Sequence, residues 1–342
     1  MISNIIQKIM KHETLTENEA FYFMEKLANG DVTDAQGSSV LSIMSFRGET
    51  IDEIVGFVKA IRKLSRAADS SQHGELMDTC GTGGDGASTF NISTAVSIIL
   101  ASLGVKVAKH GNKAVTSKSG SSDVLEALGI EAASNHFEAN SQLNKHDIAF
   151  LHAPYFHPAL KKVASLRGQL PFRTIFNCIG PLLNPMAPAY QLIGASNEEV
   201  AEKLAKVVQK LGIKRALIVT GKDGLDEVSI TGETRMYLVE NNSINSFNYT
   251  PEEAGLHRGN LNDLTVTNKK ESAVLIRSIL QGEGNESARN IVILNGAAAL
   301  FASKRVPSIR DGVEIIKQCL QSQSAYDHLE EMTKEEANAH VN

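Results

Sequence analysis

The stretch that decides the fold is Asp78-Thr79-Cys80-Gly81-Thr82-Gly83-Gly84-Asp85-Gly86. It follows the short apolar segment 75–77 and precedes a helix that the pattern predicts from near Ser93. Glycines let backbone N–H groups point into a concavity, and a helix N-terminus adds unpaired donors and a positive dipole, so the stretch suits phosphate. A tight strand-to-helix turn is the alternative for a glycine cluster taken alone. The spacing matches neither the dinucleotide-binding Gly-x-Gly-x-x-Gly pattern nor the P-loop.

Beyond this stretch, short apolar segments alternate with helical patterns. The segments are 75–77, 105–108, 148–151 and 216–219. The alternation predicts α/β units around a mainly parallel sheet, with active residues in loops beyond the carboxyl ends of the strands. The C-terminal third reads as mostly helical, most clearly at residues 286–303 and 311–321.

Before the stretch, three threonines each stand three residues ahead of a glutamate or glutamine, the pattern of a capping box at a helix start. The pairs are Thr16 with Glu19, Thr33 with Gln36, and Thr50 with Glu53. They predict a small N-terminal helical bundle, joined to the rest by the polar linker 67–74. A second helical passage, residues 157–166, is followed by closely spaced prolines. They indicate an irregular connecting segment rather than continuous regular structure.

The bulk composition excludes several classes of protein. With 342 residues and 42% hydrophobic composition the chain can bury a large core, and its length favours two domains. A formal net charge of -5 gives no general attraction to nucleic acid or anionic membrane. The N-terminus lacks the apolar run of a signal peptide, and the apolar run 95–105 is too short to span a bilayer. Three widely spaced cysteines suggest neither a disulfide framework nor a zinc site and fit the cytoplasm.

Polar side chains gather in two further places. Asn91-Ile92-Ser93-Thr94 could hold phosphate or metal, although helix capping is the likelier role for these residues taken alone. Residues 109–123 combine three lysines, His110, glycines and hydroxyls after a predicted strand, which makes an anion site plausible. A solvated basic loop would explain the lysines but less readily the glycines and hydroxyls among them.

Asp226 and Glu227 follow a predicted strand and the turn at residues 221–224. Adjacent carboxylates repel each other, and Mg²⁺, which prefers one or two carboxylates plus waters and phosphate oxygens, would relieve that repulsion. For such a pair alone, a surface position is the better interpretation. Arg167 could bind a substrate carboxylate through a bidentate pair of hydrogen bonds from its guanidinium. For an arginine taken alone, an exposed or helix-capping position is the default interpretation.

Taken together, six blocks in this order resemble the anthranilate phosphoribosyltransferase family over nearly the whole chain. They are Gly81-Thr82-Gly83-Gly84-Asp85, Phe90-Asn91-Ile92-Ser93-Thr94, Lys109-His110-Gly111-Asn112, Ser119-Gly120-Ser121-Ser122-Asp123, Phe176-Asn177 with Gly180-Pro181-Leu182-Leu183-Asn184-Pro185, and Gly224-Leu225-Asp226-Glu227-Val228-Ser229.

This resemblance implies a class II nucleoside-phosphorylase-like phosphoribosyltransferase architecture: an α/β domain with a mainly parallel central sheet and a smaller all-helical domain. Its helical domain would comprise residues 1–66, completed by an insertion around 155–190, and its α/β domain residues 75–154 and 191–342. It implies a cytoplasmic homodimer, formed through the helical domain, that makes phosphoribosylanthranilate and pyrophosphate from anthranilate and phosphoribosyl pyrophosphate (PRPP) in tryptophan biosynthesis. Neither nucleic acid nor membrane would be a partner.

The resemblance also implies roles for single residues. Mg²⁺ would be held by Ser93, Asp226 and Glu227, and anthranilate by Gly81, His110, Asn112 and Arg167, with His110 also a candidate proton acceptor. PRPP would contact Gly81, Thr82, Gly83, Gly84, Asp85, Thr89, Asn91, Ser93, Thr94, Lys109 and Ser121. Two positions depart from the family's usual pattern, Lys113 in place of arginine and Pro171 in place of glycine.

Two other functions compete with this interpretation. A pyrimidine nucleoside phosphorylase shares the architecture and a similar Lys-His-Gly-Asn loop, but would be expected to lack the Asp226-Glu227 block and the block at residues 180–185. A non-catalytic nucleic-acid-binding relative would favour a basic groove and lost metal ligands, whereas this chain is acidic and keeps both carboxylates.

Overall fold

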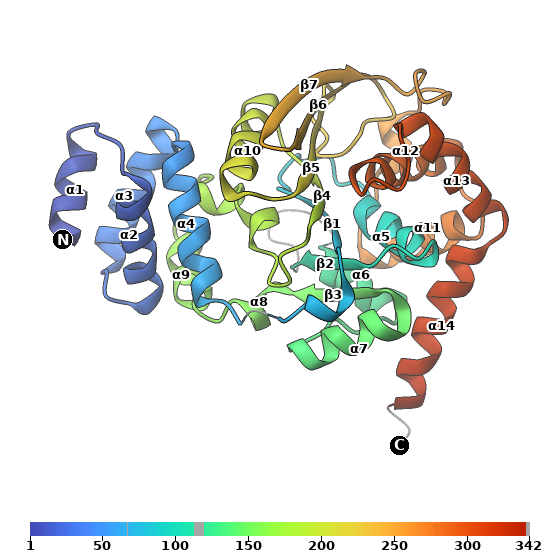
Figure 1. The fold of residues 1–342 in the computed structure, drawn as a ribbon, viewed down its shortest axis with the longest axis horizontal. Coiled ribbons are helices and arrows are strands. Elements are labelled where there is room, and N and C mark those ends of the chain that lie inside the picture. The colour runs from blue at the N-terminus through green and yellow to red at the C-terminus, as the bar shows by residue number, and fades with distance from the viewer. Residues whose placement is uncertain (67, 113–119, 340–342) are drawn as a thin grey trace.

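The computed structural model describes residues 1–66, 68–112 and 120–339, with side chains described as far as residue 333. Helices at one end of the molecule adjoin a larger α/β body, as Figure 1 shows. The end helices are α1 (Ile2–Met10), α2 (Glu17–Asn29), α3 (Asp34–Arg47) and α4 (Ile51–Leu64). Later segments join them: α8 (Ala153–Phe156), α9 (Leu160–Gly168), and the 3-10 turns η2 (Ile175–Asn177) and η3 (Gly180–Leu183).

The predicted helix starts are confirmed. At α2, α3 and α4 the N-cap threonine accepts a hydrogen bond from the third helical N–H, and the side chain at that position accepts one from the threonine's N–H. These reciprocal bonds satisfy N–H groups that would otherwise lack partners at a helix start. The sequence therefore sets where these helices begin before any packing is considered.

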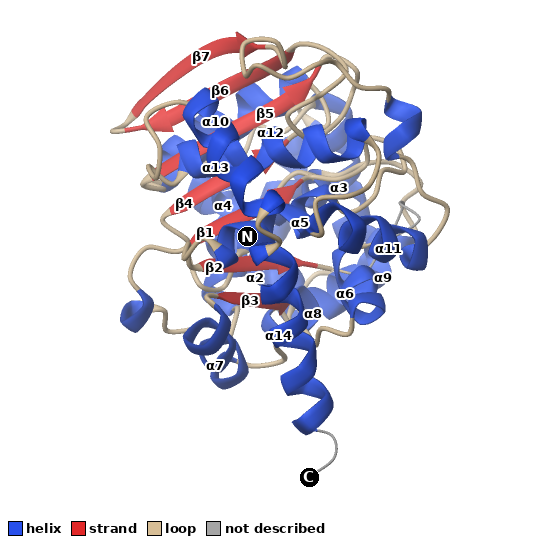
Figure 2. Ribbon diagram, turned by 90° about the vertical axis from the view of Figure 1, so that its right-hand side faces the viewer, coloured by secondary structure: helices blue, strands red, loops and turns tan. Residues whose placement is uncertain are grey.

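The α/β body is built on one seven-stranded sheet with strand order β3-β2-β1-β4-β5-β6-β7. Figure 2 shows these strands from β7 at the top to β3 at the bottom. Its strands are β1 (Met77–Gly81), β2 (Val107–Gly111), β3 (Ile148–His152), β4 (Tyr190–Gly194), β5 (Arg215–Gly221), β6 (Thr234–Glu240) and β7 (Ser243–Tyr249). The first five are parallel, and β6 and β7 continue the sheet antiparallel. The chain order reverses between β1 and β4, so a crevice is expected at the carboxyl ends of those two strands.

Helices cover both faces of the sheet. They are α5 (Ile92–Ser102), α6 (Ser121–Leu128), α7 (His136–His146), α10 (Glu198–Leu211), α11 (Lys269–Leu280), α12 (Glu286–Ala302), α13 (Ile309–Gln321) and α14 (Ser324–Ala339). One apolar core joins α5 and α11–α13 to one sheet face, while a second core joins α10 and the other face to the N-terminal helices. The predicted fold class, α/β with a smaller helical part and a mainly parallel sheet, is confirmed.

Some predicted boundaries are wrong. The first strand occupies Met77–Gly81 rather than residues 75–77, because it continues into the polar residues that precede the glycine cluster. The helix expected at 157–166 runs from Leu160 to Gly168, since Pro158 lies before its start. Strand β4 and the β6–β7 hairpin were not predicted.

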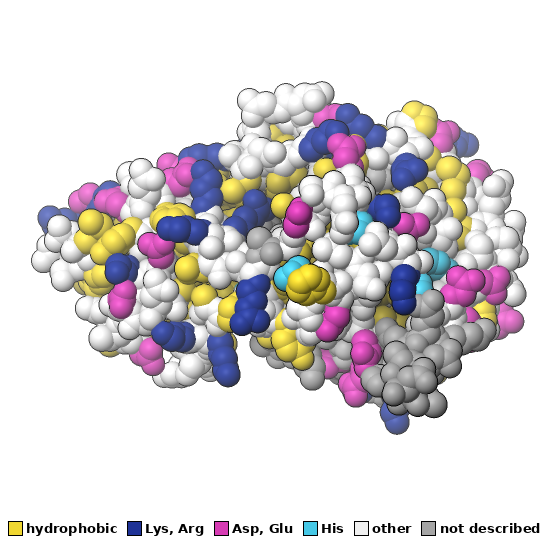
Figure 3. Space-filling view, turned by 60° about the horizontal axis from the view of Figure 1, so that its bottom comes forward, with side chains coloured by type: hydrophobic (Ala, Val, Ile, Leu, Met, Phe, Trp, Pro, Cys, Tyr) yellow, Lys and Arg dark blue, Asp and Glu magenta, His cyan; other side chains and the backbone are white. Residues whose placement is uncertain are grey.

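No helix among the described residues is long and apolar enough to cross a bilayer. On the face in Figure 3, basic and acidic side chains are interspersed.

Candidate functional site

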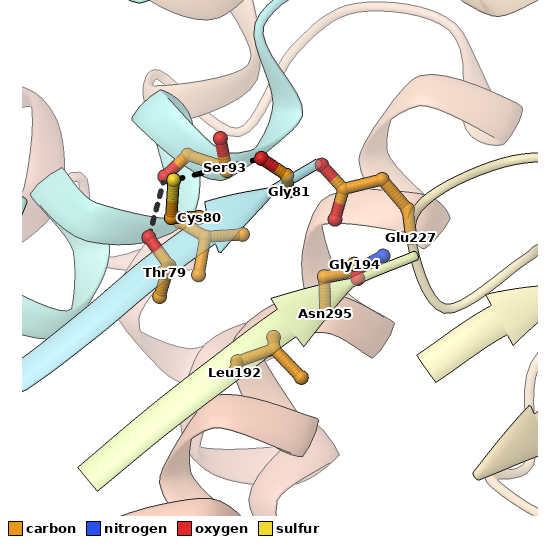
Figure 4. A pocket seen from close by; sticks show the side chains of 9 residues that line it. Thr79, Cys80, Gly81, Ser93, Leu192, Gly194, Glu227 and Asn295 are labelled. Atoms are coloured by element: carbon orange, nitrogen blue, oxygen red, sulfur yellow. Dashed lines mark hydrogen bonds between the residues drawn. The ribbon is translucent and has the colours of Figure 1, made fainter. Parts of the chain in front are cut away.

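The crevice expected at the reversal of strand order carries a pocket. Its lining includes Gly81 at the end of β1, Gly194 at the end of β4, Ser93 on α5 and Glu227, as Figure 4 shows. Gly81 and Gly194 lie opposite each other in the parallel register. These residues come from four separate parts of the chain, and only the sheet topology brings them together.

The glycine loop after β1 is held against the acidic loop after β5. The Gly83 N–H donates to Asp226 Oδ2 at 2.7 Å. A methyl group on Gly81 would run into that carboxylate, and one on Gly194 would overlap the Asp226 backbone. The glycines at 81 and 194 thus make room for Asp226, whereas Gly83 and Gly84 have φ of 67° and 79°, a conformation that favours glycine.

The acidic loop has an unfavourable charge environment. Burial, and after it the nearby Asp85, raise the pKa of Asp226 above its usual value. Burial and the charge of Asp226 raise the pKa of Glu227 in the same direction, although Lys109 and the Ser93 N–H favour its ionised form. A divalent cation would remove both penalties, so these side chains fit Mg²⁺. No group of three or more His, Cys, Asp or Glu suited to a metal occurs among the described residues.

Lys109 brings a buried positive charge to the same place. Its Nζ, near the end of β2, donates to the Thr79 carbonyl and, at 3.0 Å, to Ser93 Oγ. Ser93 lies in the first turn of α5, and the hydroxyl of its neighbour Thr94 is buried without a hydrogen-bond partner in the described part of the chain. A cation and spare hydroxyls at a helix start are suited to phosphate oxygens.

His110 lies beside the lysine but in a different environment. Its N–H donates to Asp78 Oδ1 at 3.3 Å, and Asn184 Nδ2 donates to Asp78 Oδ2 at 2.9 Å. The His110 ring meets the His157 ring edge-on, with centroids 5.3 Å apart. Burial lowers the pKa of His110 to about 3 and that of His157 to about 4, so both rings are neutral at pH 7. A neutral imidazole with so low a pKa is a weak base.

Arg167 lies at the end of α9, apart from the residues above. Its guanidinium stacks over the Phe176 ring, 5.1 Å from the centroid, and burial lowers its pKa. Burial alone shifts this pKa, and no carboxylate among the described residues raises it. A partly buried guanidinium without a counter-charge is suited to receive a carboxylate.

The remaining predicted residues lie around this centre. Asn91 takes the N-cap position of α5 but makes no side-chain capping bond; instead its Oδ1 accepts from Ser272 Oγ at 2.8 Å, so the capping role is wrong. Thr82 Oγ1 accepts from the Ser196 N–H at 3.2 Å, and Thr89 bridges to Thr265. Ser121 Oγ donates to the Asn112 carbonyl at 3.2 Å. Lys113 lies outside the described residues, and Pro171 lies between α9 and η2.

Three supporting residues were missed by sequence reasoning. Asn295 on α12 binds both the N–H and the C=O of Val228, at 2.8 and 2.9 Å, next to Glu227. His157 packs on His110, and Arg173 reaches the carbonyls of the glycine loop. Arg173 stands beside the quoted block that begins at Phe176, so proximity to that block was the only signal; Asn295 gave none.

Comparison with known proteins agrees with this geometry. A family described as "Glycosyl transferase family, a/b domain" matches residues 73–326, and "Glycosyl transferase family, helical bundle domain" matches residues 3–65. The anthranilate phosphoribosyltransferase of Geobacillus sp. (strain WCH70) is 46% identical over 341 residues, covering 100% of both chains. This chain belongs to the anthranilate phosphoribosyltransferase family.

Solved structures of the family share the fold. The Thermus thermophilus member is 35% identical with a TM-score of 0.90, covering 96% of this chain and 98% of its own. The Saccharomyces cerevisiae member, solved in complex with PRPP and Mg, is 26% identical with a TM-score of 0.89, covering 98% of each chain. The pocket at the β1–β4 reversal therefore lies in a full-length family scaffold.

Proposed function

We propose that this protein transfers the phosphoribosyl group of PRPP to the amino group of anthranilate, giving phosphoribosylanthranilate and pyrophosphate in tryptophan biosynthesis. The observation that carries the proposal is the meeting of the glycine loop, Lys109, Ser93 and the Asp226–Glu227 pair at the β1–β4 reversal. Family membership over the whole chain supports the same reaction.

The residues on the PRPP side match the demands of the reaction. Loss of pyrophosphate places negative charge on the leaving group and positive charge on the ribose carbon. Free N–H groups of the glycine loop, the first turn of α5 and Lys109 would stabilise the leaving group. Asp226, Glu227 and Ser93 would hold Mg²⁺, which when bound neutralises part of the pyrophosphate charge. Of the other predicted contacts, Thr82, Asp85, Thr89, Asn91, Thr94 and Ser121 would complete the PRPP pocket.

On the acceptor side the main task is orientation. The aromatic amine of anthranilate has a free lone pair at neutral pH, so attack does not require a strong base beforehand. We propose that Arg167 binds the carboxylate of anthranilate, while Gly81, Asn112 and His110 line the pocket. The low pKa of His110 argues for an uncharged contact rather than a strong general base.

The direct test follows anthranilate fluorescence in the presence of PRPP, with and without Mg²⁺. We expect magnesium-dependent loss of fluorescence in the wild type and at least a roughly thousandfold slower loss in Asp226→Ala/Glu227→Ala, because the cation and its leaving-group stabilisation are both lost. Circular dichroism would confirm that the variant is folded. Turnover that is equal with and without Mg²⁺ would contradict the metal assignment, and no turnover by folded wild type would indicate another aromatic acid as acceptor.

We further propose the division into a helical domain, 1–66 with an insertion around 155–190, and an α/β domain, 75–154 and 191–342. The packing of α9 on α2 and α3 supports this division.

We also propose a homodimer formed through the helical domain, where the exposed fraction is 90% for Phe46 and 63% for Met10. Light scattering of Phe46→Asp should show a monomer. Three free thiols support a cytoplasmic location.

A further inference from the structure

Arg173 connects two parts of the molecule that are distant in sequence. From the segment between α9 and η2, its Nη1 donates to the Gly84 carbonyl and its Nη2 to the Gly83 carbonyl, both at 3.0 Å. The carbonyl of Arg173 itself accepts from Ser45 Oγ, on α3, at 2.6 Å. A continuous chain of hydrogen bonds therefore runs from α3 through Arg173 to the glycine loop.

These contacts set the direction of two peptide planes. In a trans peptide the C=O and the following N–H point in opposite directions. Because Arg173 holds the carbonyls of Gly83 and Gly84, the N–H groups of Gly84 and Asp85 point away from the guanidinium. Neither N–H has an acceptor among the described residues, whereas the N–H of Gly83 is already bound to Asp226. Gly84 is exposed and Asp85 is half-buried, so a ligand can approach the two free donors.

We propose that Arg173 is a positioning residue for the pyrophosphate group of PRPP. It holds the glycine loop on the side of its carbonyls, so that two N–H donors on the opposite side are oriented before the ligand binds. The inference rests on the proposed PRPP site. Glycines with positive φ are conformationally free, and holding them in one arrangement reduces the entropy lost on binding. The planar guanidinium suits this task because it reaches two carbonyls at once, which an ammonium group cannot do with the same geometry.

Arg173 also connects the helical part to the proposed PRPP site. Ser45 anchors the backbone of Arg173, so α3 and the glycine loop are coupled through one residue. Removal of the Ser45 hydroxyl should have an effect only while the guanidinium is present. The pair Ser45 and Arg173 should therefore be non-additive in a double-mutant cycle.

The test is calorimetric titration of PRPP with Mg²⁺ in the absence of anthranilate, so that no turnover occurs. For Arg173→Ala we expect a PRPP dissociation constant raised about tenfold and, in separate steady-state assays, an unchanged KM for anthranilate, because only the preorganisation of the donors is lost. Arg173→Lys should resemble Arg173→Ala. The matched control is Lys162→Ala, which removes a bond from α9 to a different backbone carbonyl, that of Asn29 at 2.7 Å, far in sequence from the glycine loop.

Each alternative gives a different result. Wild-type affinity in Arg173→Lys would show that Arg173 acts as a charge on the phosphate and would overturn the positioning role. Lower melting temperature with unchanged PRPP affinity in Arg173→Ala would show a structural role only. Asp226→Ala/Glu227→Ala is the reference: if it too bound PRPP normally with Mg²⁺, the proposed site itself would be wrong, whereas a loss there alone would reject only the inference about Arg173.

Discussion

The two sides of the site are buried in opposite electrical conditions. On the proposed PRPP side, burial raises the pKa of Asp226 and Glu227. On the proposed acceptor side, burial lowers the pKa of Arg167, His110 and His157. Without ligands, burial disfavours the charged forms on both sides, and the counter-charges that would favour them have opposite sign: a cation on one side and a carboxylate on the other. Burial thus prepares the two sides for different ligands.

The largest effect that would test this contrast is expected at Arg167. Arg167→Ala removes the cation of the proposed acceptor side, so we expect kcat/KM for anthranilate to fall about a hundredfold, as for a lost charge-assisted hydrogen bond, with PRPP affinity unchanged. Steady-state kinetics with each substrate varied would measure the split. Lys161→Ala, at an exposed position of the same helix, is the control and should behave as wild type. An equal loss of PRPP affinity would erase the distinction between the two sides.

A smaller effect is expected at Gly81. A methyl group at a phosphate-binding glycine would enter the space of the phosphate, but in the structure the methyl group at position 81 meets the Asp226 carboxylate instead. Gly81→Ala should therefore displace that carboxylate and weaken Mg²⁺-dependent PRPP binding about tenfold by calorimetry. Gly232→Ala has open space for its methyl group and should bind normally. Weaker PRPP binding that is equal with and without Mg²⁺ would support the phosphate explanation after all.

The last effect concerns stability rather than ligand binding, through pH and the neutral histidines. Because the folded-state pKa of His157, about 4, lies below the usual value of 6.5, the unfolded chain binds the proton first as pH falls. The contribution of this group to stability is complete above pH 6.5 and is lost toward pH 4, which amounts to about 2 kcal/mol at pH 5. His157→Gln should lose that much less stability than wild type between pH 7.5 and pH 5 in urea denaturation.

The comparison between variants is needed because Asp78, whose pKa burial raises to about 6, has the opposite effect on the wild-type profile. His257→Gln, at an exposed histidine, should keep the wild-type slope. Identical slopes for His157→Gln and the wild type would mean that His157 is accessible to protons in the folded state.

The sequence predicted what depends on short-range chemistry. Capping threonines set the starts of α2–α4, and the glycine cluster and the Asp226–Glu227 pair lie where strand ends were expected. Features that depend on distant partners could not be predicted. Arg173 binds carbonyls 89 and 90 positions away, and Asn295 supports a loop 67 positions away, so no local pattern marks either residue. The predicted position of strand β1 was wrong because its polar residues are buried by neighbouring strands of the sheet. Their own low hydrophobicity does not mark them as part of a strand.

The second apolar core has a consequence for how the molecule unfolds. It is continuous from α1–α4 through α10 to the β4–β5 face of the sheet, so α10 connects the N-terminal helices to the sheet. Deleting these helices would remove the packing of α4 on α10 and leave part of this apolar core open to water. Thermal unfolding of the two parts should therefore be one cooperative event.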